Sequence, residues 1–200
     1  MLYVSHRESS TKVLGPGQRY ALWVQGCDKR CPNCVFPAGQ AKNSGGQWIS
    51  VGRLWQEIKK VPALTGLTIS GGEPFLQAPA LSRLVKLLRE ESELDVMIFT
   101  GYTLAELRAR HDASTDFLLA NIDILVDGDY REALNTNSLY RGSDNQIIHF
   151  LTPKYLPFRD LIERTKNRSV EFVCRADGEL FLVGIPAKDF GKNFLDKILE

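Results

Sequence analysis

The sequence predicts an α/β protein, built as a partial (β/α) barrel of four to six parallel strands followed by a C-terminal β-hairpin. Short apolar segments alternate with amphipathic ones along most of the chain, which is typical of βαβ units. Polar or glycine-rich loops follow the apolar segments, and in α/β proteins that edge of the sheet carries the functional groups. At 200 residues the chain is short for a complete barrel, which needs about 250 residues.

The first predicted strand, RYALWVQ at 19–25, is apolar and runs directly into a loop rich in cysteine. A helix is predicted over 50–61, because Ser50 is a suitable N-cap and apolar residues recur at helical spacing behind it. GLTIS at 66–70 then reads as a short buried strand that ends at GGEP. The apolar face of the predicted helix consists of Val51, Leu54, Trp55 and Ile58.

The middle of the chain continues the alternation. A leucine-rich helix is predicted over 78–91, and DVMIFT at 95–100 forms the next strand, which stops at GYT. Thr103 is placed to cap the helix that follows, LAELRAR. IDILVDG at 122–128 is the fourth strand of this series, again ended by glycine after an acidic residue.

The last third of the chain changes character. A strand is predicted over 145–151 and a helix over 158–166. Residues 169–186 read as two strands joined by a tight turn at 176–179, because Asp-Gly between apolar runs is a strong hairpin signal. No internal repeat or long linker divides the sequence, so we expect residues 1–200 to form one domain.

Composition narrows the classes of function. The formal net charge of +1 gives no electrostatic basis for binding nucleic acid. No run approaches about 18 apolar residues, and the first residues lack the apolar core of a signal peptide, so we expect a cytoplasmic protein. Thiols stay reduced in that compartment, which favours metal binding or catalysis for clustered cysteines.

Three of the four cysteines lie in the stretch GCDKRCPNC, directly after the first predicted strand. Cys27, Cys31 and Cys34 are soft ligands that select zinc, copper(I) or iron–sulfur clusters. Three thiolates leave one metal position without a protein ligand, and on a [4Fe–4S] cluster one iron is then open to a small molecule.

Two alternatives remain open on spacing alone. The three thiolates are also suited to structural zinc, completed by Cys174 or by one of the three histidines. Cys174 otherwise reads as a small buried residue of a strand. CPNC is also a C-x-x-C pair, but it does not lead into the helix that a thioredoxin-type redox motif uses. The three histidines are His6, His111 and His149.

The cysteine loop after the first strand and SGGEP after the second together resemble the radical S-adenosylmethionine (SAM) superfamily. LGPGQRYALWVQGC, TGYT, VDGDY and YRGSDNQ extend the similarity over roughly residues 14 to 147, to the glycyl-radical enzyme activases and to the family that activates anaerobic ribonucleotide reductase. The chain departs from many members at Asn33, where they place an aromatic residue, and has Phe36 beyond the third cysteine.

The resemblance implies a [4Fe–4S] cluster held by Cys27, Cys31 and Cys34, with SAM on the fourth iron. Reductive cleavage of SAM would give a 5′-deoxyadenosyl radical that abstracts hydrogen from the substrate, so the three cysteines are both metal ligands and catalytic residues. The resemblance implies that the following residues bind the cofactor: Asn33, Val35, Phe36, Gly71, Gly72, Glu73, Pro74, Thr100, Gly101, Asp127 and Arg141.

Several of these assignments have a structural alternative. The two glycines of GGEP also suit a plain strand-to-helix turn. Asp129 is an alternative to Asp127, and Arg141, whose guanidinium suits an anionic group, also fits a simple surface turn. LVGIP at 182–186 is predicted either to face the adenine or to form the last core strand.

The resemblance further implies a glycyl-radical enzyme, such as anaerobic ribonucleotide reductase, as the partner whose glycine is converted to a radical. A flavodoxin or ferredoxin is the expected electron donor. The alternatives are a radical SAM enzyme that modifies a small molecule or a peptide, and a non-catalytic zinc or iron–sulfur module. We expect no nucleic acid and no membrane among the partners.

Overall fold

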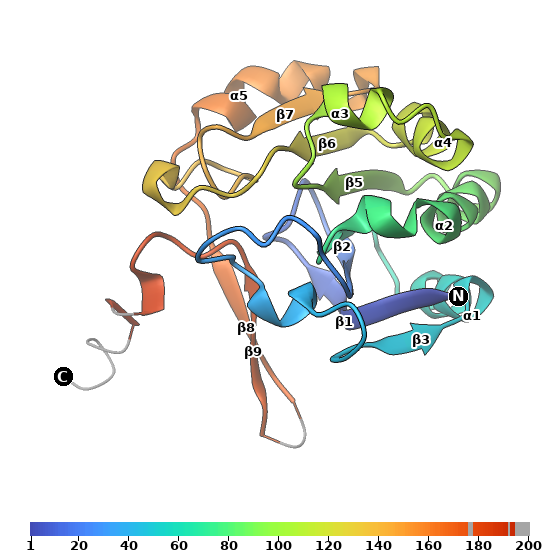
Figure 1. Ribbon diagram of the computed structural model, residues 1–200, viewed down its shortest axis with the longest axis horizontal. Helices are drawn as coiled ribbons and strands as arrows, with labels where there is room; N and C mark the ends of the chain where they lie inside the picture. Colours follow the sequence, from blue (N-terminus) through green and yellow to red (C-terminus); the bar gives the residue numbers. More distant parts are fainter. Residues whose placement is uncertain (176–177, 192, 195–200) are drawn as a thin grey trace.

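A seven-stranded sheet lies at the centre of the molecule in the computed structural model, which describes residues 1–175, 178–191 and 193–194 (Figure 1). The strand order is β3-β1-β2-β4-β5-β6-β7. The central strands β2, β4, β5 and β6 are parallel, whereas β1 is antiparallel to β2 and β3, and β7 is antiparallel to β6. This sheet, which does not close, confirms the predicted α/β partial barrel. The strands are β1 (Leu2–Thr11), β2 (Arg19–Val24), β3 (Gln47–Ile49), β4 (Gly66–Gly71), β5 (Asp95–Phe99), β6 (Ile124–Asp127) and β7 (Ile147–Phe150).

Helices α1, α2 and α4 pack along one side of this sheet, where α2 contacts both of the others (Figure 1). Ile162 of α5 packs on the other side, with Met97, Ile124 and Val126. The predicted caps are confirmed at two of them. Ser50 Oγ accepts a hydrogen bond from Arg53 N at 3.2 Å, and Thr103 forms a capping box with Glu106. The helices are α1 (Val51–Lys59), α2 (Ala78–Glu91), α3 (Leu104–Arg108), α4 (Ala113–Asn121) and α5 (Arg159–Arg164), and 3₁₀ turns include η1 (Pro37–Gln40), η2 (Pro74–Gln77), η3 (Glu132–Leu134) and η4 (Pro153–Phe158).

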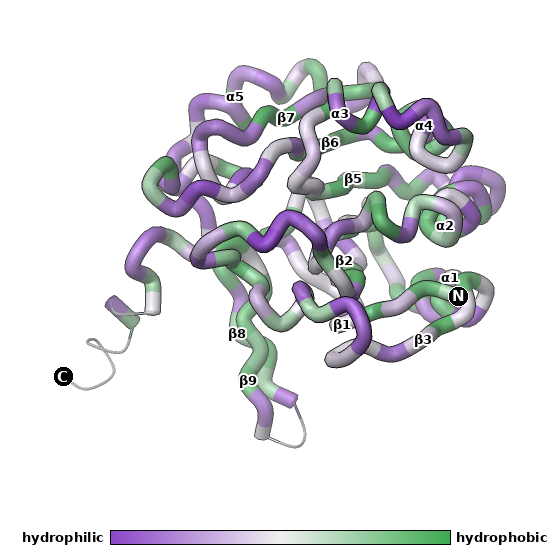
Figure 2. Tube along the Cα trace, in the orientation of Figure 1, coloured by the Kyte–Doolittle hydropathy of each residue, from purple (hydrophilic) through white to green (hydrophobic). Residues whose placement is uncertain are grey.

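The core forms between the helices and the sheet. Leu54, Trp55 and Ile58 of α1 are buried there, as their spacing predicted, and Leu81, Leu84, Val85 and Leu88 of α2 join them. Figure 2 shows hydrophobic residues concentrated on β5 and β6 inside the molecule and hydrophilic residues along α5 at its surface. Within the described residues no helix is long and apolar enough to cross a membrane.

A two-stranded hairpin projects beside the sheet and is not part of it (Figure 1). It consists of β8 (Val170–Cys174) and β9 (Leu180–Gly184), which pair antiparallel as predicted. Residues 176 and 177 of the predicted turn lie outside the described residues. Cys174 at the end of β8 is exposed rather than buried, because it points to the open face of the hairpin.

Candidate functional site

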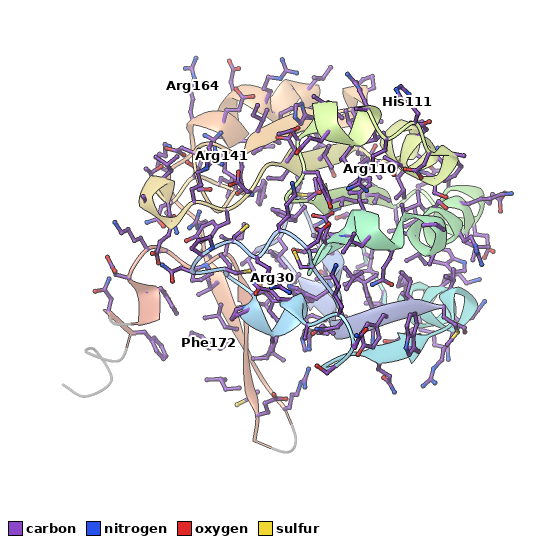
Figure 3. All side chains as sticks on the ribbon, in the orientation of Figure 1. Arg30, Arg110, His111, Arg141, Arg164 and Phe172 are labelled. Carbon is purple, nitrogen blue, oxygen red and sulfur yellow. The ribbon has the colours of Figure 1, made fainter. Side chains whose placement is uncertain are left out.

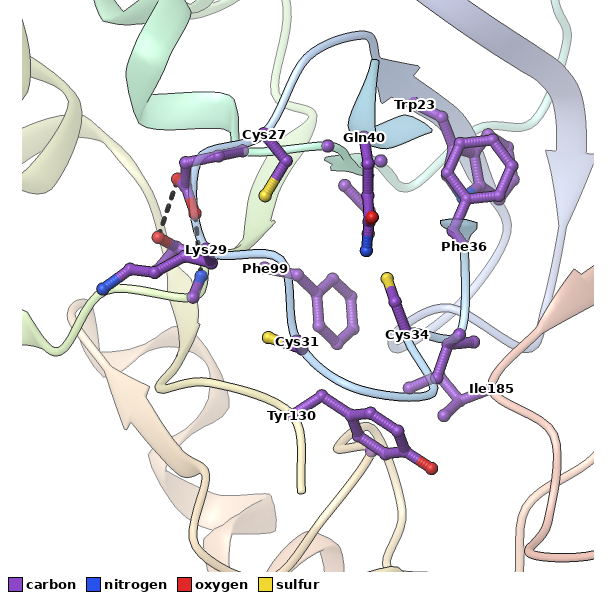
Figure 4. A pocket seen from close by; sticks show the side chains of 18 of the residues that line it. Trp23, Cys27, Lys29, Cys31, Cys34, Phe36, Gln40, Phe99, Tyr130 and Ile185 are labelled. Carbon is purple, nitrogen blue, oxygen red and sulfur yellow. Dashed lines mark hydrogen bonds between the residues drawn. The ribbon is translucent and has the colours of Figure 1, made fainter. Parts of the chain in front are cut away.

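The three clustered cysteines lie on one loop that follows β2. Cys27, Cys31 and Cys34 are partly buried and form no disulfide. Their sulfur atoms face a common cavity, which Tyr130 and Phe99 also line (Figure 4). Burial raises the pKa of the Cys27 and Cys31 thiols, so binding a metal here would release protons from them.

Backbone hydrogen bonds hold this loop against the 3₁₀ turn η1. Gly26 N donates to Gly39 O at 2.8 Å and Cys27 N donates to Gln40 O at 3.1 Å. The side chain of Asn33 donates to Glu132 Oε2 at 2.7 Å and ties the loop to η3. Asn33 has a φ of 54°, a left-handed conformation that asparagine adopts more readily than most residues. The loop is therefore fixed at both ends before any ligand binds.

The GGEP segment lies directly beside the cysteine loop. Gly72 N donates to Val24 O and Glu73 N donates to Gly26 O, both at 2.8 Å. A Cβ atom added at Gly72 would lie 2.3 Å from Gly26 O, so only glycine fits. Gly71 has a φ of 106°, which also favours glycine. The glycines bring the end of β4 into backbone contact with the loop that carries the thiols.

Glu73 joins the ends of β4 and β5 beneath this cavity. Its Oε1 accepts hydrogen bonds from Thr100 Oγ1 at 2.8 Å and Phe75 N at 2.9 Å, and its Oε2 accepts one from Gly101 N at 2.8 Å. The residue is 1% exposed, and this burial raises the pKa of its carboxyl to about 7. Glu73 is therefore a positioned carboxyl that changes its charge near neutral pH.

Ten of the residues predicted from the sequence line this one cavity, so the structure brings the two principal motifs together. The cysteine loop and the ends of β4 and β5 supply them, as expected where parallel strands end. The ten are Cys27, Cys31, Cys34, Val35, Phe36, Gly71, Gly72, Glu73, Thr100 and Gly101.

Four predicted residues do not line the cavity. Asn33 binds Glu132, and Pro74 begins η2 behind the loop. Asp127 Oδ2 accepts hydrogen bonds from Leu104 N at 2.6 Å and from His149 Nε2 at 2.8 Å, so it connects α3 and β7 to the end of β6. Arg141 Nη1 donates to Gln146 O and its Nη2 lies 3.7 Å from Asp144, within the loop before β7.

Several lining residues were not found by sequence reasoning. Phe181 and Trp23 form an aromatic wall with Phe36, with ring centroids 5.7 to 6.5 Å apart. The ring of His6 stacks on Phe181 at 3.6 Å, and burial with the neighbouring Arg175 lowers its pKa to about 4. Phe181 lies in no motif, whereas Trp23 and Tyr130 lie in the segments LGPGQRYALWVQGC and VDGDY, which carried the resemblance without assigning these two residues to the site. The missed lining residues include Trp23, Lys29, Gln40, Phe99, Tyr130, Gln146 and Phe181.

The cysteine and histidines that could complete a zinc site have other surroundings. Zinc needs its ligands to converge on one point. Cys174 is exposed on the hairpin, His149 is bonded to Asp127, and His6 to Arg175. In an iron–sulfur cluster each thiolate binds a different iron, so three partly buried sulfurs around one cavity suit this cofactor.

Comparison with known proteins decides the family. The sequence model of the family described as "4Fe-4S single cluster domain" matches residues 13–149. The chain belongs to this family. A match of this extent indicates an iron–sulfur cluster as the cofactor of the domain.

Several relatives share a description that names an activating protein. The chain is 36% identical over 147 residues to the anaerobic ribonucleoside-triphosphate reductase-activating protein of Vibrio cholerae, covering 70% of this chain and 92% of that protein. The Escherichia coli K12 protein of the same name is 34% identical over 146 residues with the same coverage. The protein of that name from Enterobacteria phage T4 is 31% identical over 141 residues, covering 68% and 86%. The chain is thus a member of the activating-protein family.

Proposed function

We propose that the chain is a radical SAM enzyme that installs a glycyl radical on a partner enzyme such as anaerobic ribonucleotide reductase. The observation that carries the proposal is a cavity with three unpaired thiols on one side and the GGEP edge on the other. Relatives that cover most of its length are named as activating proteins of this reductase. We infer that the described parts act together as one radical SAM domain.

In this proposal Cys27, Cys31 and Cys34 would hold the [4Fe–4S] cluster as thiolates, with no further protein ligand left for SAM to displace. The cluster would supply the one electron with which SAM is cleaved to methionine and a 5′-deoxyadenosyl radical, the species that would take hydrogen from a glycine Cα. The role of the protein is to bind and orient SAM and to exclude water from the site. The aromatic wall of Trp23, Phe36 and Phe181 serves the last purpose, because it covers one flank of the cavity with apolar surface.

The residues of the strand ends position SAM in this proposal. Carbonyl groups near Gly71 and Gly72 suit the SAM ammonium, and Val35 and Phe36 suit the adenine. Both carboxylate oxygens of Glu73 already accept hydrogen bonds, so we assign it to fixing Thr100 and Gly101 beside the cavity. The loops around the site are held by Asn33, Pro74, Asp127 and Arg141.

The proposed reaction needs a one-electron donor, and a flavodoxin or ferredoxin would serve. The same site would also suit a small molecule or a peptide as hydrogen donor. The named function of the relatives favours the glycyl-radical partner over both.

The first experiment tests the cofactor. Anaerobically purified protein should contain about four irons and four sulfides per chain, and Cys27→Ala should lose them. Cys174→Ala is the matched control, because this thiol is exposed on the hairpin and should leave the iron content unchanged. Stoichiometric zinc in the wild-type protein would contradict the proposal.

The second experiment tests the reaction. SAM should alter the electron paramagnetic resonance signal of the reduced cluster, and 5′-deoxyadenosine should form. Adding the anaerobic ribonucleoside-triphosphate reductase of the same organism should then give a glycyl radical on that protein. If 5′-deoxyadenosine forms but the reductase acquires no radical, the enzyme class stands and the partner is wrong.

A further inference from the structure

The hairpin β8–β9 carries two different faces. Paired residues of antiparallel strands point to the same side, so Val173, Phe181 and Val183 share one face. Val183 is fully buried, and this face packs on Leu14, Ala21 and Trp23 beside the cavity. The other face carries Val170, Phe172, Cys174, Leu180 and Leu182.

The second face is apolar and open. Phe172 is 42% exposed, Leu180 is 54% exposed, and Cys174 between them is exposed as well. Figure 2 shows hydrophobic residues along both strands, and Figure 3 shows Phe172 on the outer side of the hairpin, away from β1. An antiparallel sheet with one solvated face normally alternates apolar and polar residues. The pattern here is instead that of a sheet covered on both sides, and exposed apolar patches mark interaction sites.

The hairpin is fixed to the body of the protein. Glu171 accepts hydrogen bonds from Thr11 Oγ1 at 2.6 Å and Lys12 N at 3.1 Å. Arg175 Nη2 donates to His6 Nδ1 at 2.7 Å. A surface held in place in this way loses little freedom when a partner binds to it.

The open face leads into the functional cavity. Leu182 lies on this face and also lines the cavity, as does Gly184. Ile185, just beyond β9, lines the cavity too (Figure 4). The rings of Phe190 and Phe194 lie against Phe172, in the middle of β8, with ring centroids 6.3 and 4.9 Å from its own. Cys174 and Leu180 remain open. The family model matches residues 13–149, so the hairpin lies beyond the matched region.

We propose that the outer face of β8–β9 docks the protein substrate, binding an apolar segment of the glycyl-radical partner and guiding its glycine into the cavity. This inference rests on the proposed function. The continuity through Leu182 is the reason for choosing the substrate protein, because its backbone must reach the cavity while the rest of it stays outside. The five side chains of the face are uncharged, so the matching segment is apolar.

The test introduces a charge on this face. Leu180→Lys should weaken equilibrium binding of the anaerobic ribonucleoside-triphosphate reductase of the same organism by about ten-fold or more, since it places an ammonium where an apolar contact forms. Cleavage of SAM without the reductase should be unchanged. Leu161→Lys is the matched control, because this α5 leucine is 65% exposed and lies at the other end of the molecule in Figure 1, and its binding should match the wild type. Cys174→Glu provides a second variant on the proposed face.

The outcomes separate the two proposals. If the cluster-loaded wild type cleaves SAM but does not bind the reductase, or if Leu180→Lys and Cys174→Glu both bind it as the wild type does, the docking inference is wrong and the enzyme class stands. If the wild type binds the reductase without cleaving SAM, the proposed function is wrong, and the loss of binding in Leu180→Lys still supports the docking face. If Leu180→Lys changes only the sedimentation of the chain measured without the reductase, the face is an interface between two copies of this chain. If Leu180→Lys lowers the thermal stability by as much as deletion of residues 195–200 does, the face is covered by the chain's own end. Either result overturns the inference.

Discussion

Two glycines determine how closely the end of β4 approaches the cysteine loop. At Gly72 the nearest obstacles to a side chain are backbone atoms, Gly26 O at 2.3 Å and Gly39 O at 2.6 Å. Backbone cannot rotate away as a flexible side chain can, so an added methyl group must move the loop that carries the thiols. The consequence of this contact for the cluster site can be measured.

Gly72→Ala should lower the iron content of anaerobically purified protein and destabilise the fold, because the cysteine loop is displaced. Gly52→Ala is the control: nothing lies within 4 Å of its added Cβ, and it sits in α1. There alanine should raise the free energy of unfolding by up to about 1 kcal/mol and leave iron unchanged. Full iron occupancy in Gly72→Ala would contradict the close contact.

Glu73 should make stability depend on pH. Burial raises the pKa of its carboxyl from 4.5 to about 7, so folding favours the protonated form. The contribution of Glu73 to the unfolding free energy is therefore complete below pH 4.5 and is lost as pH rises through about 7. Glu73→Gln cannot titrate, so this decrease should be absent from its stability curve.

The measurement is chemical denaturation of the cluster-loaded protein without SAM between pH 5 and 8. Wild type and Glu73→Gln are compared at each pH, so that titrations common to both cancel. The variant also loses the hydrogen bond from Gly101 N, which shifts its whole curve without changing the slope. Parallel curves for the two proteins would show that Glu73 does not titrate in this range.

The residues that belong to short motifs were predicted from the sequence. GCDKRCPNC identified the thiols and GGEP identified the end of β4, because each motif is recognised from the spacing of residues close together in the chain. Phe181 and Trp23 were missed, since an aromatic residue in a strand gives no sign of which surface it faces. Their position depends on how a hairpin more than 140 residues further along the chain returns to the first loop, and local patterns do not encode that return.

At the scale of the elements, α3 shows how a few residues determine where a helix begins. This short helix starts at a capping box, in which Thr103 Oγ1 accepts from Glu106 N at 3.2 Å and Glu106 Oε2 accepts from Thr103 N at 2.6 Å. Asp127 Oδ2 accepts from Leu104 N at the same end. Three of the helix's unpaired donors are therefore satisfied.

Thr103→Ala should lower the free energy of unfolding by about 1 kcal/mol, because the hydroxyl that caps Glu106 N is removed. Denaturation in urea measures the change. Lys86→Ala, in the exposed middle of α2, serves as a control and should change stability by a few tenths of a kcal/mol. Thr103→Ser keeps the hydroxyl, so it should retain most of the stability.

Elements with strong periodicity were predicted, and those without it were missed. α1 and α2 have clear apolar stripes, and β4 and β5 are short apolar runs. In β1 apolar residues occur only near its start, whereas Glu8, Ser9 and Ser10 near its end are polar. The apolar stretch is therefore too short to be recognised as a strand from the sequence. α4 has no clear apolar face, and β3 has three residues. Contacts with neighbouring elements stabilise β1, β3 and α4, and such contacts cannot be recognised from a local sequence pattern.

At the scale of the whole molecule, a buried ion pair joins three parallel strands at the edge opposite the site. Arg19 at the start of β2 lies 2.7 Å from Asp95 of β5, and both side chains are 0% exposed. Arg19 also donates to Thr68 Oγ1 and Leu67 O of β4 between them. Tyr155 Oη donates to Asp95 Oδ2 at 2.6 Å and connects η4 to the same point.

Asp95→Asn should lower the free energy of unfolding by about 3 kcal/mol or more, because it leaves the guanidinium of Arg19 buried without its counter-charge. Lys154 also lies 3.2 Å from Asp95, but its side chain is 45% exposed. Lys154→Ala should therefore cost less than about 1 kcal/mol. Equal losses in the two variants would contradict the importance of the buried pair.

The boundary of the family match has a practical consequence. Residues 13–149 include every thiol of the cysteine loop, yet Phe181, Leu182 and Ile185 on the other side of the cavity come from beyond it. A fragment that ended before β8 would keep the whole central sheet and the ligands, but Trp23 and Phe36 would lose the aromatic ring that covers them. Dioxygen and bulk solvent would then reach the sulfurs from that flank, so the trimmed fragment should lose its iron in air faster than the full chain.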